Sequence, residues 1–135
     1  MRVHHAIGVS FWQSAQTGNA INSFDRALSI SQERGDKYLE YTAFGNLGTI
    51  YNDLSSYDSA IDYYEKALVI SRELGNRRGE SVLLGNLGLT HENQGNFESS
   101  IRQHEATFSI SREFADASNE AKHFRQSWGS LRKAW

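Results

Sequence analysis

The sequence predicts an all-α fold of three tandem helix pairs followed by a closing helix, and two observations lead to this prediction. The first is an internal repeat: residues 45–48 read Gly-Asn-Leu-Gly, and the same four letters return 40 residues later at 85–88. The second is the helical spacing of apolar residues, as in Leu47, Ile50 and Leu54. No segment alternates as a half-buried strand does.

The 40-residue register extends over most of the chain. Isoleucine stands at positions 30, 70 and 110, and glycine stands at positions 8, 48 and 88. Repeats that hold one register over such a distance indicate a stack of similar units in one continuous domain. We therefore expect a single domain over residues 1–135 with seven helices, in which repeat 1 spans 1–36, repeat 2 spans 37–76, repeat 3 spans 77–116 and a capping helix spans 117–135.

Each unit is expected to hold two antiparallel helices, because turn residues recur between the apolar stretches. Glycine can take the left-handed conformation that ends a helix, and Asp or Asn can cap the next one. The breaks are expected at Gly35-Asp36, Ser55-Ser56, Gly75-Asn76 and Gly95-Asn96.

Small residues are expected where paired helices approach closely. Gly48 and Ala60 are placed to meet in repeat 2, and the larger Tyr51 and Tyr64 fill the space beside them. With Ala67 these residues follow the order small, aromatic, alanine, aromatic, alanine.

This order resembles the tetratricopeptide repeat, and the longer 40-residue unit resembles the Pins/LGN-type G-protein-signalling modulators. The ending at residues 73–80 and the pair His104-Glu105 carry the second resemblance. The resemblance implies a right-handed α-solenoid whose first helices line a concave surface that binds a peptide or helix of a partner protein. It implies a scaffold or adaptor rather than an enzyme.

On that surface Asn46 and Asn86 are the leading candidates, because a side-chain amide can both donate to and accept from a peptide backbone. A solvated or helix-capping role for both amides stays open. The resemblance places further residues on the same concave face: Thr49, Asn52, Asp53, Asn93, Lys122 and Arg125.

Composition narrows the class of partner. The formal net charge of -2 gives no overall attraction to nucleic acid or to an anionic membrane. The chain has no cysteine, and no phosphate loop, zinc motif or nucleophile motif occurs in it. We therefore expect a cytoplasmic protein that binds protein, with no cofactor, no catalytic residue and no metal site.

Two alternatives depend on local features. His91 and His104 replace aromatic residues of repeat 3 and form a candidate pH-sensitive or metal-binding pair, against an ordinary packing role. In the closing helix Phe124, Trp128 and Leu131 fall on one stripe with Trp135, which is expected to cap the solenoid. The stripe also allows a second hypothesis, a structural module that forms homo-oligomers through its open ends.

Overall fold

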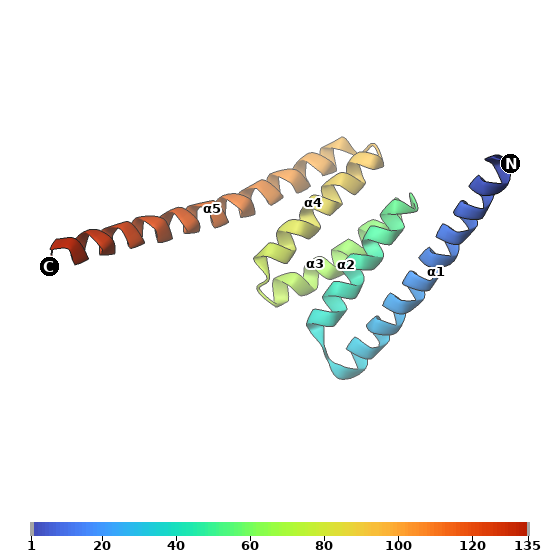
Figure 1. Ribbon diagram of the computed structural model, residues 1–135, viewed down its shortest axis with the longest axis horizontal. Helices are drawn as coiled ribbons and strands as arrows, with labels where there is room; N and C mark the ends of the chain where they lie inside the picture. Colours follow the sequence, from blue (N-terminus) through green and yellow to red (C-terminus); the bar gives the residue numbers. More distant parts are fainter. Residues whose placement is uncertain (1, 135) are drawn as a thin grey trace.

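Five helices make up the structure, a computed structural model that describes the backbone of residues 2–134 and the side chains of residues 14–128. In chain order the helices are α1 (Arg2–Arg34), α2 (Lys37–Asp53), α3 (Tyr57–Glu73), α4 (Arg77–Asn93) and α5 (Phe97–Ala134). No strand occurs among the described residues. Figure 1 shows α2, α3 and α4 as a compact centre, with the longer α1 and α5 extending from it. The all-α prediction is confirmed.

The prediction of seven helices is wrong, because two expected breaks do not form. The two helices of repeat 1 are one continuous helix of 33 residues, α1. The second helix of repeat 3 continues into the closing segment as one helix of 38 residues, α5. Residues 117–134 are therefore the outer half of α5, and they form no separate capping helix.

Alanine explains both missing breaks. The chain turns after α2 and after α4 through residues with positive φ, Ser55 at 61° and Gly95 at 82°. One or two repeats earlier, the same column of the 40-residue register holds Ala15. Alanine is the best helix former, whereas serine and glycine have lower helix propensities, so the helix continues through Ala15.

The same argument applies to α5. The turns after α1 and α3 use Gly35 with φ 65° and Gly75 with φ 66°. Their column holds Ala115 in the third repeat. Asp116 stands where Asp36 and Asn76 cap the next helices, yet a capping side chain alone does not end α5.

Three of the four predicted breaks have the expected side-chain cap, at Asp36, Asn76 and Asn96, whereas Ser56 makes no side-chain capping hydrogen bond. The side chain of Asp36 accepts a hydrogen bond of 3.0 Å from the Leu39 N–H, and that of Asn76 accepts one of 3.0 Å from the Gly79 N–H. Such bonds satisfy amide groups that have no partner inside the first helical turn.

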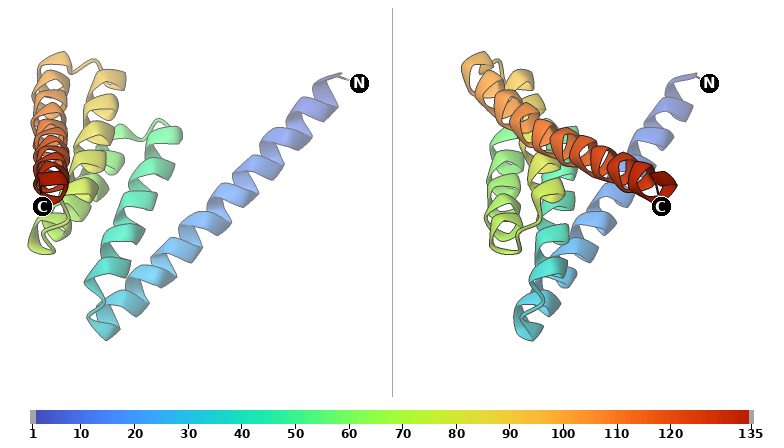
Figure 2. Two further views of the ribbon diagram at one scale, coloured as in Figure 1. Left: turned by 60° about the vertical axis from the view of Figure 1, so that its left-hand side comes forward. Right: turned by 90° about the vertical axis from the view of Figure 1, so that its left-hand side faces the viewer.

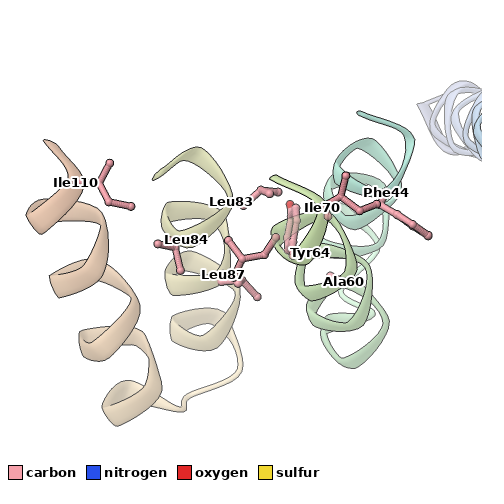
Figure 3. Packing of buried hydrophobic residues seen from close by; sticks show 10 residues of the cluster. Phe44, Ala60, Tyr64, Ile70, Leu83, Leu84, Leu87 and Ile110 are labelled. Atoms are coloured by element: carbon pink, nitrogen blue, oxygen red, sulfur yellow. The ribbon is translucent and has the colours of Figure 1, made fainter. Parts of the chain in front are cut away.

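The core lies between α2, α3 and α4 and reaches the inner half of α5 (Figure 3). Its members are almost entirely apolar: Phe44, Ala60, Tyr64, Ala67, Leu68, Ile70, Leu83, Leu84, Leu87 and Ile110. Each helix packs against the next one in the chain, and α2 also touches α4. Figure 2 shows that α1 diverges from α2 toward its N-terminal end, while the outer half of α5 extends beyond α4.

Glycine allows each helix pair of the centre to pack closely. A Cβ atom at Gly48 would lie 2.6 Å from Cδ1 of Tyr64, and one at Gly88 would lie 2.7 Å from Cε1 of His104. The ring of the second helix therefore lies directly against the glycine of the first, closer than the side-by-side arrangement expected from the sequence. The equivalent residue of repeat 1 is Gly8, which lies outside residues 14–128, the range over which side chains are described.

An ion-pair network ties the start of α4 to its neighbours. The nearly buried Glu80 carboxylate accepts hydrogen bonds from Arg72 Nε at 3.1 Å and from Arg77 Nη1 at 2.8 Å. Arg77 also donates to Glu113 on α5, at 2.6 Å. Burial raises the pKa of Glu80, but the two arginines outweigh this effect, so its pKa lies below the usual value.

We expect Gly48→Ala to destabilise the fold by about 1–3 kcal/mol, because the new methyl group overlaps the Tyr64 ring. Gly45→Ala is the matched control on the same helix, since its Cβ would lie 3.7 Å from Leu83 Cδ2, an ordinary contact. There the higher helix propensity of alanine should add up to about 1 kcal/mol. Urea unfolding of both variants measures the difference, and equal stabilities would contradict the close contact.

Glu80→Gln should lower the free energy of unfolding at neutral pH by about 1–2 kcal/mol, because hydrogen bonds to a charged partner are lost. The folded-state pKa of Glu80 is depressed, so its contribution is present above the unfolded pKa of about 4.3 and is lost as pH falls through the folded value. The gap between wild type and variant should therefore close in acid. Asp62→Asn, which removes an exposed pair with Lys66, is the control with little expected effect.

Ala115→Gly should introduce a break in α5, because it restores glycine in the column of Gly35 and Gly75, directly before the capping Asp116. Cα chemical shifts at residues 115 and 116 should lose their helical values. Ala117→Gly is the control, since it costs a similar propensity of about 1 kcal/mol without that register. Unbroken helical shifts in Ala115→Gly would show that Ala115 does not account for the continuous helix.

Candidate functional site

A groove runs between α2 and α4, on the side where these two first helices of their units face each other. It is lined by uncharged residues only: Tyr38, Tyr41, Thr42, Gly45, Asn46 and Thr49 from α2, with Val82, Leu83 and Asn86 from α4. The 40-residue register places Asn46 and Asn86 at equivalent positions, so the groove presents one amide from each helix. Three predicted site residues, Asn46, Thr49 and Asn86, are thus brought together.

The polar groups of the groove differ in how far they are already engaged. Asn46 is exposed and Asn86 is half-buried. The Thr49 hydroxyl lies 3.2 Å from the carbonyl oxygen of Gly45 and 3.0 Å from the Tyr64 hydroxyl, so it is held by the fold. Thr42 donates to the carbonyl oxygen of Tyr38. The two amides are therefore the groups best placed to meet a partner's backbone.

The groove also has apolar and aromatic parts that can anchor a ligand. Tyr38 is 65% exposed and Val82 is 61% exposed. The Tyr38 and Tyr41 rings lie 5.9 Å apart. Burial, and then the neighbouring Tyr38, raises the pKa of Tyr41, so its phenol stays neutral at physiological pH. The surface is therefore an uncharged one that combines hydrogen-bonding amides with exposed apolar area.

The other predicted residues lie apart from this groove. The Asn52 side chain accepts a hydrogen bond of 3.1 Å from Thr90 and so links α2 to α4. Asp53 lines a second hollow, between α1 and α2, with Thr17 and Ile50. Asn93 is exposed in the last residue of α4.

Lys122 and Arg125 are exposed on the outer half of α5. Because the expected capping helix does not fold back, this segment extends away from α2 and α4 (Figure 1). These two residues therefore do not line the groove.

Sequence analysis did not single out Tyr38 and Tyr41, although both line the groove. The signal was present, because Tyr38, Thr42, Asn46 and Thr49 follow one another at steps of four, four and three. Extending the predicted set from Asn46 by about two helical turns toward the N-terminus of α2, through Thr42, would have found Tyr38.

The two histidines of repeat 3, His91 and His104, differ in their contacts. The His104 ring lies against Gly88, and its Nε2 atom is 4.0 Å from Glu92. His91 has a buried Nδ1 atom with no hydrogen-bond partner among the described residues. Within the described part of the chain, no three His, Cys, Asp or Glu residues are grouped so that they could hold a metal ion.

The hydropathy of the helices bears on the membrane question. Over the residues that the structure describes, none of the helices has the length and apolar character needed to cross a membrane.

Comparison with known proteins addresses the fold and the family. The solved TPR domain of Arabidopsis FLU matches with a TM-score of 0.68 and 21% identity, covering 80% of this chain and 91% of that one. The N-terminal domain of stress-induced protein-1 from C. elegans matches with a TM-score of 0.52 and 13% identity, covering 77% and 95%. Comparison with curated proteins gave no match.

The family model described as tetratricopeptide repeat matches residues 1–68 and 38–113, which together take in most of the chain. The paired helices of the centre, with their glycine-to-ring contacts, agree with this match. The chain belongs to the tetratricopeptide repeat family.

Proposed function

We propose that this protein is a non-catalytic scaffold and that the groove between α2 and α4 binds an extended peptide or a helix of a partner protein. The observation that carries the proposal is the pair of equivalent amides, Asn46 and Asn86, set in an uncharged groove beside exposed Tyr38 and Val82. Tetratricopeptide repeat domains generally mediate interactions between proteins, and this groove lies on the first helices of their units.

The lining favours an uncharged segment with apolar side chains as the ligand. Asn46 and Asn86 can each donate to and accept from the backbone of such a segment. Tyr38 and Val82 offer apolar area that a ligand side chain can cover, and a tyrosine loses little conformational entropy when it is fixed. No basic residue lines the groove, so we propose a protein ligand rather than a nucleic acid.

The finer predictions extend this proposal. The 40-residue unit length supports a Pins/LGN-like subtype, and such a subtype implies an adaptor role. A cytoplasmic location stays a prediction. Asn52, Asp53, Asn93, Lys122 and Arg125 stay predictions for contacts outside the groove.

A phage-displayed library of random peptides provides a test that needs no known partner. Selected peptides should bind the wild-type protein, and the double variant Asn46→Ala, Asn86→Ala should bind them about 5- to 150-fold more weakly, at about 0.5–1.5 kcal/mol for each hydrogen bond lost. Isothermal titration calorimetry gives the affinities. Circular dichroism checks that both proteins are equally folded.

Further variants separate the groove from the wider surface. Asn119→Ala removes an exposed amide on α5, outside the groove, and should leave affinity unchanged, whereas Tyr38→Ala should weaken binding. Lys122→Ala with Arg125→Ala tests whether the outer half of α5 takes part. If the Asn46, Asn86 double variant binds every selected peptide as the wild type does, the groove is not the binding site.

A further inference from the structure

The helix α5 carries an apolar stripe that continues past the end of α4. The stripe consists of Ile110, Phe114, Ala117, Ala121, Phe124 and Trp128, spaced at alternating steps of four and three. This spacing has a period of 3.5 residues, which is the period of helices that pack along one another in coiled coils.

Only the inner part of this stripe is covered. Ile110 is 3% exposed and belongs to the core. Coverage ends at Phe114, where Arg78 in the first turn of α4 lies 5.4 Å from the ring. Beyond that point Phe124 is 63% exposed and Trp128 is 53% exposed, with their rings 5.8 Å apart. The face that packs α5 onto α4 therefore continues for several turns without a partner in the described chain, where the outer half of α5 extends away from the other helices (Figure 1).

We propose that a second copy of this chain covers the outer stripe, which consists of Ala117, Ala121, Phe124 and Trp128, and that the two α5 helices pack antiparallel. The outer stripe is self-complementary in this direction, because its two residues nearer to α4, Ala117 and Ala121, are small and its two residues farther from α4, Phe124 and Trp128, are large. A two-fold axis between positions 122 and 123 places Trp128 of each copy against Ala117 of the other. The same axis places Phe124 against Ala121, so one symmetry operation makes all four contacts.

Charge and space agree with the antiparallel direction. Glu120 and Arg125 flank the stripe, and the axis sets Glu120 of each copy level with Arg125 of the other, so that residues of opposite charge share one level along the pair. In a parallel pair the inner half of the second α5, with its own α4, would have to occupy the face that α4 of the first copy already covers. The antiparallel pair keeps the two helical bodies at opposite ends.

This inference is independent of the proposed peptide groove, which lies on α2 and α4. The two surfaces can therefore be tested separately with the same full-length protein.

Sedimentation equilibrium over a wide range of protein concentration is the first test. The wild type should reach twice its chain mass of 15.3 kDa. The double variant Phe124→Glu, Trp128→Glu should stay monomeric with an unchanged circular dichroism spectrum, because both side chains are exposed in the single chain. Ala117→Glu with Ala121→Glu tests the same contact from its small side. Lys122→Glu, on the opposite face of the helix, is the control that should still dimerise.

The direction of pairing has its own measurement, since the chain contains no cysteine that would compete for a label. Spin labels at Arg112→Cys should lie farther apart along the axis than labels at Lys122→Cys by roughly 30 Å, at about 1.5 Å per residue on each of two helices. Electron–electron double resonance reports this distance. Equal distances at both positions, a wild type that is monomeric throughout, or a dimer that survives the Glu substitutions would each overturn the proposal.

Discussion

The close approach of paired helices is the constraint on which the rest of this structure depends. Gly48 and Gly88 leave no side chain between their helix and the next, and the rings of Tyr64 and His104 fill that space. A ring packed directly on a backbone fixes both the distance and the register of the pair. Once α2 and α3, and α4 and α5, are held in this way, α2 and α4 come to face each other and the groove between them follows.

The ends of the molecule show what happens where a second condition is missing. A helix pair needs a turn as well as a packing contact, and each turn here passes through a residue with positive φ. Where alanine stands in a turn column, at Ala15 and at Ala115, the helix continues. The two halves of repeat 1 therefore cannot face each other, and the closing segment does not fold back onto repeat 3. The repeat pattern therefore extends further along the sequence than the antiparallel helix pairs do in the structure.

This difference between centre and ends separates two kinds of surface. In the centre, residues of neighbouring units meet, so that Asn46 and Asn86 share one uncharged groove. At the C-terminal end the apolar stripe of α5 continues past the end of α4, so that Phe124 and Trp128 remain exposed. We propose a peptide ligand for the first surface and another copy of the same helix for the second, and both surfaces follow from how far the pairing of helices extends.

The sequence by itself determined the helical content, the repeat register, the four turns and the small positions at which helices meet, because each depends on local spacing or on the conformational range of single residues. It also placed Asn46 and Asn86 on one surface, since equivalent columns of a repeat lie on the same face, and both residues line the groove. Only the tertiary structure decided which predicted residues meet. The Asn52 side chain accepts a hydrogen bond from Thr90, and Asp53 lines the hollow between α1 and α2. Lys122 and Arg125 lie on a helix that does not fold back. The physical reason is that one alanine in a turn column changes the path of the whole chain after it, and a residue-by-residue comparison of repeats gives that column no more weight than any other.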